Sequence, residues 1–258
     1  MTISLPHLLV FLAGCPRVMA LVAFAPGFNA GFVPPTVRVT LGLALAFALA
    51  PLIVPPGQDV LALTAEAYGG LLLGELALGA IIGFLLSTLL EAARLAGEIV
   101  DFQIGFRAGS MYDPATGGHS ALLGQFWYLA ALLFFFVING HHWLMTGLMR
   151  SFELCPIGGL SSAPGLAGIA IQVISASFLL ALQLAAPVVG ALILADLTLG
   201  LVGRGMPQMN LMLVGMPAKI TLGVAALALS SPMMATAFTR LFESFQQYLT
   251  AALRLIAG

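Results

Sequence analysis

Four ionisable residues follow one another at helical spacing in the middle of the chain: Glu91, Arg94, Glu98 and Asp101. The intervals of three, four and three positions put them on one stripe of a helix. Carboxylates there can act as general bases, pair with cations or line a wet surface. No nucleophile or metal-ligand set accompanies them, so we expect no catalytic residues. Two interpretations stay open: a solvated face with local ion pairs, or a face toward partner subunits or a wet channel.

Two further charges, Asp196 and Lys219, each stand alone in a long apolar run. An isolated charge in an apolar environment costs on the order of several kcal/mol, so each needs a partner or a wet cavity. If the chain reverses near residues 206–209, the two residues lie at similar distances from the turn. We therefore expect them to pair or to face a common polar surface.

Other residue patterns give no sign of a metal or cofactor. His141 and His142 are adjacent, and adjacent helical side chains point about 100° apart, which does not allow joint chelation. They follow Asn139-Gly140, so we expect them to cap or end a membrane segment. The two cysteines are too few for a disulfide framework or a metal cluster. The glycine-rich segment near residue 110 lacks the Gly-Lys-Ser/Thr ending of a phosphate-binding loop.

The elements that must position these residues are almost entirely apolar. The chain has 258 residues, of which 60% are hydrophobic and only 7% charged. Soluble domains carry about 25% charged residues, so this composition indicates an integral membrane protein that touches lipid. The net charge of −1 argues against a nucleic-acid partner.

Helical apolar patterns dominate the chain, and some are longer than one membrane crossing. A helical pattern runs from near Leu61 to Gly105 and again from Leu166 to Val202. The second would extend roughly 55 Å as an unbroken helix, and Pro187 and Gly190 offer a kink within it. Lys and Arg show no clear bias between loops, which indicates that partner proteins determine the placement. Residues 238–256 form an amphipathic pattern, expected to pack on a partner rather than on a membrane surface. The six apolar stretches are approximately 5–25, 36–54, 68–90, 121–148, 166–202 and 209–231.

The segment GEIVDFQIGFRAGSMYDPATGGHS, residues 97–120, interrupts this apolar pattern. Its glycines give backbone freedom, and Asp113-Pro114 favours a turn. Bulky side chains such as Phe106, Met111 and Tyr112 are unusual in a polar linker. Irregular backbone at membrane depth is tolerated only inside protein or beside water. We therefore favour a packed, re-entrant or gating loop over a plain exterior loop.

Several stretches together resemble the FliR/SctT family of type III export-gate proteins. They are DFQIGFRAGSMYDPATGG, NGHHWLMTGLMRSFELCPIG and LAAPVVGALILADLTLGLVGRGMPQMNLMLVGMPAKI. The block from Arg204 to Asn210 is the most specific, and Gln208 and Asn210 belong to the Pro-Gln-x-Asn core that both branches share. The continuation from Val214 to Ile220 looks more like the flagellar than the virulence branch. The resemblance covers nearly the whole chain.

The resemblance implies an all-α, integral membrane-type protein with long kinked helices and helical hairpins, part of a multi-subunit gate. Its implied partners are FliP, FliQ, FlhB and FlhA, in the bacterial inner membrane and the flagellar basal body, with part of the assembly on the periplasmic side. Unfolded flagellar proteins would pass through. Residues 1–205 would resemble FliP, and residues 206–258 a FliQ-like helical hairpin with an amphipathic C-terminal helix.

The resemblance also implies that the loop 105–120 plugs the central pore. The residues assigned to this plug are Phe106, Gly109, Met111, Tyr112, Asp113 and Pro114. The polar residues expected at subunit interfaces or buried are Glu91, Arg94, Glu98, Asp101, Asp196, Arg204, Gln208, Asn210 and Lys219. The alternatives are a virulence-type SctT subunit or, with less support, a small-molecule transporter, for which no inverted repeat is visible.

Overall fold

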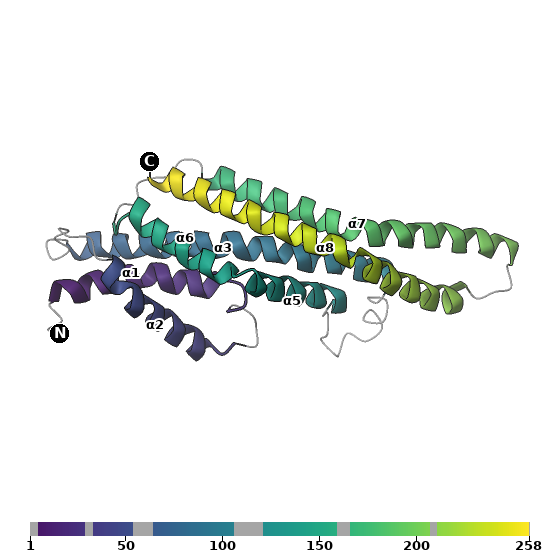
Figure 1. Cartoon of the computed structure of the whole chain (residues 1–258), viewed down its shortest axis with the longest axis horizontal. Coiled ribbons are helices and arrows are strands. Elements are labelled where there is room, and N and C mark those ends of the chain that lie inside the picture. The colour runs from purple at the N-terminus through teal and green to yellow at the C-terminus, as the bar shows by residue number, and fades with distance from the viewer. Residues whose placement is uncertain are drawn as a thin grey trace. The chain divides into compact units, whose positions relative to one another are not determined.

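A computed structural model describes residues 5–28, 33–53, 64–105, 121–158, 166–206 and 211–257 of the protein. Within these ranges the chain forms helices and no strands, which confirms the all-helical prediction (Figure 1). The helices are α1 (Leu5–Phe24), α2 (Pro35–Ile53), α3 (Ala65–Ile104), α5 (Leu122–Val137), α6 (Gly140–Leu154), α7 (Leu166–Gly205) and α8 (Leu211–Ala257).

The long helices expected from the apolar pattern are present. α3 and α7 have 40 residues each and α8 has 47. Forty residues extend about 60 Å, twice the hydrocarbon thickness of a bilayer. Among the described residues, two helical segments are long and apolar enough to cross a membrane, Glu66–Ile104 and Gly168–Gly205. Up to four spans result if each of two bent helix pairs counts as one span.

One predicted stretch, 121–148, is not continuous. It is divided between α5 and α6 by a break at Ile138 and Asn139, where Asn139 adopts a left-handed conformation with φ 58°. Asparagine tolerates this conformation better than most residues because its short side chain bonds locally. His141 and His142 lie in the first turn of α6, directly after this break, and their place at the end of a membrane segment stays a prediction.

The predicted amphipathic segment 238–256 is helical, but its apolar face packs within this chain rather than on a partner. Residues 238–256 belong to α8, which continues through Pro217 and Pro232. The apolar face of this part is buried by the chain itself, including Phe242, Phe245 and Leu249. A proline inside a helix removes one hydrogen bond and can kink the helix without ending it.

The chain divides into two compact units that are each discontinuous in sequence. Unit 1 comprises residues 1–89, 135–174 and 243–258, and unit 2 comprises residues 90–134 and 175–242. In unit 1, α1 packs on α2, where the ring centroids of Phe11 and Phe47 lie 6.3 Å apart. α1 also approaches α3 closely, because a Cβ atom at Gly79 would overlap the carbonyl group of Arg17.

Unit 2 is built on the end of α3, the start of α5, and the facing parts of α7 and α8. A Cβ at Gly223 of α8 would lie 2.5 Å from Ile104 and 3.7 Å from Leu192 of α7, so three helices meet there. α7 and α8 contribute the arms of a helical hairpin in this unit, whereas the sequence placed a whole hairpin in 206–258. The division at residue 205 concerns which family each part resembles, and it stays a prediction.

Candidate functional site at the ends of the central loop

The structure describes the two helix ends that flank the central loop. α3 ends at Ile104, Gly105 follows with φ 92°, and α5 begins at Leu122. We call residues 97–105 and 121–124 the loop root; both parts belong to unit 2. Several predicted site residues lie outside the described ranges: Phe106, Gly109, Met111, Tyr112, Asp113, Pro114, Gln208 and Asn210.

Asp101 joins the two halves of the loop root. It is fully buried, and its Oδ2 accepts hydrogen bonds from the backbone N–H groups of Leu123 (3.0 Å) and Gly124 (3.3 Å). The first N–H groups of a helix have no partner within that helix, and a negative charge at this end is favourable. The carboxylate on α3 therefore caps α5, a helix 22 residues further along the chain.

Two glycines let α3 and α5 touch at the loop root. A Cβ at Gly97 would lie 2.6 Å from Gly124 Cα, and a Cβ at Gly124 would lie 2.9 Å from the Cγ of Glu98. Separations below 3.0 Å do not occur between real Cβ atoms and their neighbours, so side chains at these positions would push the helices apart. The backbones can then approach closely, as at other small-residue helix contacts in membrane proteins.

The remaining residues of the charged stripe pack partly on the same unit. The Arg94 guanidinium lies 4.3 Å from the centroid of the Tyr128 ring on α5, and Arg94 Nε lies 3.3 Å from Glu91 Oε2. The Arg94 and Glu91 side chains are 37% and 48% exposed, respectively. The predicted local ion pair is thus present, and a role of the stripe toward partner subunits stays a prediction.

The last turn of α3 is also fastened to α7 and α8. The side chain of Ile104 is buried against Gly223. Gln103 Nε2 donates a hydrogen bond to Asp196 Oδ2 at 3.1 Å, and Lys219 forms an ion pair with Asp196 Oδ1. The predicted pairing of Asp196 with Lys219 is therefore present, and the structure adds Gln103 to it. The helix end from which the loop departs is held on both of its sides.

The loop root offers no reactive constellation. Within the described ranges, no three residues among His, Cys, Asp and Glu come close enough to hold a metal ion. The carboxylates of Asp101 and Asp196 are both engaged in helix capping or ion pairing. Arg204, another predicted site residue, is exposed in the last turn of α7, where a cation is favourable. These contacts position helices relative to one another.

Sequence reasoning missed a buried ion pair in unit 1. Arg17 Nε donates to Glu75 Oε2 at 2.7 Å, and both side chains are at most 1% exposed. Arg17 also donates to Ser151 Oγ (3.2 Å) and to the carbonyl of Cys155 (3.0 Å), while the N–H of Gly158 donates to Glu75 Oε1 (3.1 Å). The signal in the sequence was a single charge in each of two apolar runs, the same pattern that indicated Asp196 and Lys219.

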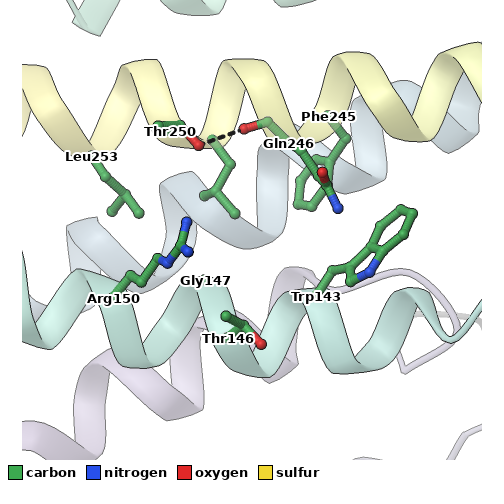
Figure 2. A pocket seen from close by; sticks show the side chains of 9 residues that line it. Trp143, Thr146, Gly147, Arg150, Phe245, Gln246, Thr250 and Leu253 are labelled. Atoms are coloured by element: carbon green, nitrogen blue, oxygen red, sulfur yellow. Dashed lines mark hydrogen bonds between the residues drawn. The ribbon is translucent and has the colours of Figure 1, made fainter.

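A groove between α6 and α8 lies in unit 1 (Figure 2). It has a volume of about 200 Å³ and an apolar floor of Gly147, Phe245, Leu249 and Leu253. Figure 2 shows Arg150 of α6 and Gln246 of α8 at its polar rim, where Thr250 Oγ1 donates to the carbonyl of Gln246 at 2.8 Å. The groove forms where the amphipathic part of α8 packs on α6.

Comparison with known proteins identifies the class of protein to which this chain is similar. The family described as "Bacterial export proteins, family 1" matches residues 8–245. The flagellar biosynthetic protein FliR of Bacillus subtilis is 35% identical over 83% of this chain and 81% of its own length. The FliR of Escherichia coli is 34% identical over 88% and 86%, respectively. The surface presentation of antigens protein SpaR of Shigella sonnei is 27% identical over 81% and 79%.

A membrane-type chain of long helices with an anchored central loop thus falls among bacterial export proteins. The family match covers far more than half of the chain, and two relatives exceed 30% identity over most of their length. The chain belongs to the FliR family of flagellar export proteins. Family membership places it in a membrane export apparatus and confirms the resemblance drawn from the sequence motifs.

Proposed function

We propose that this chain is a structural subunit, not an enzyme, of the flagellar type III export gate. With FliP and FliQ it would form the entrance pore for unfolded flagellar proteins, and FlhB and FlhA would lie beside it. The family match over residues 8–245 carries this proposal. The location that follows is the bacterial inner membrane within the flagellar basal body, with part of the assembly on the periplasmic side.

The surface of the chain supports a role within a larger assembly. Large apolar side chains are exposed along α7, among them Phe178 (56%), Leu194 (65%) and Leu201 (69%). Lipid can cover about 30 Å of such a helix, which corresponds to roughly 20 residues. α7 is twice that length, so neighbouring protein must cover the remainder. This fits a helix that packs against several other subunits.

The loop 105–120 would act as the plug of the pore. The support comes from its apolar and aromatic residues and from the loop root, which fastens its starting helix to α5, α7 and α8. A plug must resist displacement by the membrane potential and still move during export. Fixed ends with a glycine-rich interior meet both needs.

The parts of the chain would contribute differently to the gate. Residues 1–205 would take a FliP-like position in the helical assembly, and residues 206–258 a FliQ-like position. The polar residues Glu91, Glu98, Arg204, Gln208 and Asn210 would lie at subunit contacts. Polar groups at such contacts favour one partner and one register over others.

Co-purification tests the proposed assembly directly. The tagged chain is expressed with FliP and FliQ, extracted in mild detergent and analysed by native mass spectrometry. We expect a discrete complex that contains all three proteins, and aggregation of the chain when it is expressed alone. A control membrane protein of similar hydropathy should retain neither partner. A stable, monodisperse chain that retains neither FliP nor FliQ would overturn the proposal and favour a transporter.

The relation to SpaR motivates a second candidate, an SctT-type subunit of a virulence secretion system. The identity to SpaR is 27%, against 35% and 34% for the two FliR proteins. The discriminating experiment is complementation of strains that lack either the flagellar or the virulence subunit. Restored swimming supports the flagellar assignment, and restored effector secretion alone supports the alternative.

A further inference from the structure

We propose that Asp101 is a positioning residue that ties together the two ends of the central loop. This inference rests on the proposed function of the loop as a plug. Asp101 lies on α3 just before the loop departs, and its carboxylate binds the first turn of α5, where the loop has returned. The tie thus connects two chain positions on either side of the whole loop.

α5 has no cap of its own within its first residues. The residue before it is Ala121, which carries no side-chain oxygen, and its first turn contains no acidic residue. Ser, Thr, Asp or Asn normally occupies the position before a helix and binds these N–H groups. Here the carboxylate that does so comes from α3. The start of α5 therefore depends on the neighbouring helix for both its hydrogen bonds and its location.

Two contacts about one helical turn apart fix the geometry of the tie. At Gly97 and Gly124 the helices touch without intervening side chains, and Asp101 binds α5 one turn further along α3. A single contact would leave the first turn of α5 free to rotate about it. Two contacts fix both its separation from α3 and its direction.

The end of α3 that carries Asp101 is itself packed against two other helices. Gln103 binds Asp196, and Ile104 fills the notch at Gly223, so the last turn of α3 is held against α7 and α8. Asp101 is fully buried in this packed environment. The start of α5 is thus placed through Asp101 relative to this packed end of α3.

The first measurement is the distance between spin labels on the two ends of the loop. Phe102 and Leu122 are suitable label positions because they are 71% and 67% exposed. Each is replaced by cysteine in a chain whose native cysteines are changed to alanine, and the complex with FliP and FliQ is assembled in membranes. We expect Asp101→Ala to broaden the distance distribution at least twofold. Glu66→Ala, which removes an exposed carboxylate from the first turn of the same helix, should leave it unchanged.

A second variant separates positioning from simple capping. Ala121→Ser supplies a cap within α5 itself, which can bind the free N–H groups without reaching α3. In the double variant Asp101→Ala/Ala121→Ser we expect the distance distribution to stay broad and ions to leak through the assembled gate. A return of both readouts to wild type would overturn the proposal, because local capping would then be the whole role of Asp101. Failure of both variants to assemble would also overturn it, since Asp101 would then serve assembly.

Deletion of residues 107–117, measured in parallel, distinguishes this inference from the proposed function. If the deletion leaks and the double variant seals, the plug stands and the positioning role of Asp101 fails. If the deletion itself stays sealed, the plug function fails, and the label distances alone decide whether Asp101 ties the loop ends. Broad distances in the Asp101 variants would then support the tie, and unchanged distances would overturn it.

Discussion

At the scale of single residues, Arg17 shows how this chain keeps a full charge inside an apolar unit. Each of its nitrogen atoms has an acceptor: Glu75, Ser151 or the carbonyl of Cys155. The guanidinium also lies 4.1 Å from the centroid of the Phe152 ring. Such a network joins α1, α3 and α6 in unit 1, and removal of one partner leaves the other charged and buried.

Arg17→Met should therefore destabilise the protein strongly, by about 3–5 kcal/mol, because Glu75 is left uncompensated. Glu75→Met should do the same for Arg17. The double variant should lose less than the sum of the two single losses, because no unpaired charge remains. Thermal unfolding of the purified complex measures this. Arg254→Met, at an exposed position of α8, is the control, and single variants as stable as this control would contradict the prediction.

The reactivity of the Cys155 thiol reports on the burial of the same network. It lies outside the helices at the end of α6 and is 2% exposed, and burial raises the pKa of its thiol, against a smaller opposing effect of Arg17. A raised pKa keeps the thiol protonated, and the thiolate is the reactive form. We expect maleimide to label Cys155 only after denaturation, as judged by mass spectrometry. Labelling of the native protein at the denatured rate would show that the site is open.

At the scale of elements, glycines decide where helices approach each other. Gly79 of α3 faces the backbone of α1, and Gly83, one turn later, would place a Cβ 2.7 Å from the Cβ of Phe24. This spacing brings two small residues onto one face of α3, as in close helix pairs within membranes. Other glycines of α3, such as Gly70, have nothing within 4 Å of the Cβ position.

Gly79→Ala should thus destabilise unit 1, since its added methyl group overlaps the Arg17 carbonyl and forces the helices apart. Overpacking of this kind costs about 1–3 kcal/mol. Gly70→Ala on the same helix should be neutral or stabilising by up to about 1 kcal/mol, because alanine favours the helix. Unfolding temperatures of the two variants give the comparison. A Gly79→Ala variant no less stable than Gly70→Ala would refute the close approach.

The Asp196–Lys219 pair joins α7 to α8 in unit 2, and its charges can be exchanged. We expect Asp196→Lys and Lys219→Asp each to reduce swimming in a complemented strain. The double exchange should recover part of the loss, though not all, since Gln103 would lose its acceptor. Swimming-zone diameter in soft agar measures the effect. A double variant that swims less than both single variants would contradict the pairing.

Helix type and length followed well from the sequence because apolar periodicity is a local property. The length of α3 and α7 was visible, and so was the pairing of Asp196 with Lys219, since isolated charges in apolar runs demand partners. The break at Asn139 within 121–148 was missed although Asn139-Gly140 was noted. Continuation of α8 through Pro232 was also missed, because a proline within a helical pattern indicates an end or a kink.

The contacts of the loop root could not be predicted. That Asp101 would cap α5 depends on two residues 22 and 23 positions away, and no periodicity encodes such a contact. Arg17 and Glu75 are separated by 58 positions, and their pairing needed the arrangement of three helices. The sequence showed that the stripe from Glu91 to Asp101 is unusual. Only the burial of Asp101 in the structure distinguishes this residue from the other three.

At the scale of the whole molecule, the composition sets the environment. A chain with 7% charged residues exposes many large apolar side chains when taken alone. Helices of 40 residues are too long for lipid to cover entirely. We therefore expect the chain to be stable only within its assembly. Several of the few charged residues, such as Arg17, Asp101 and Asp196, make contacts within the chain that hold helices together.

The measurement that tests the central claim most directly is ion conductance through the assembled gate with and without residues 107–117. The complex of this chain with FliP and FliQ is reconstituted in planar bilayers, and assembly of each sample is checked by native gel. The account predicts a closed wild-type gate and a deletion variant that assembles normally but conducts ions. A deletion variant that assembles and remains closed would contradict the role of the loop as the plug and leave it as a packing element between subunits.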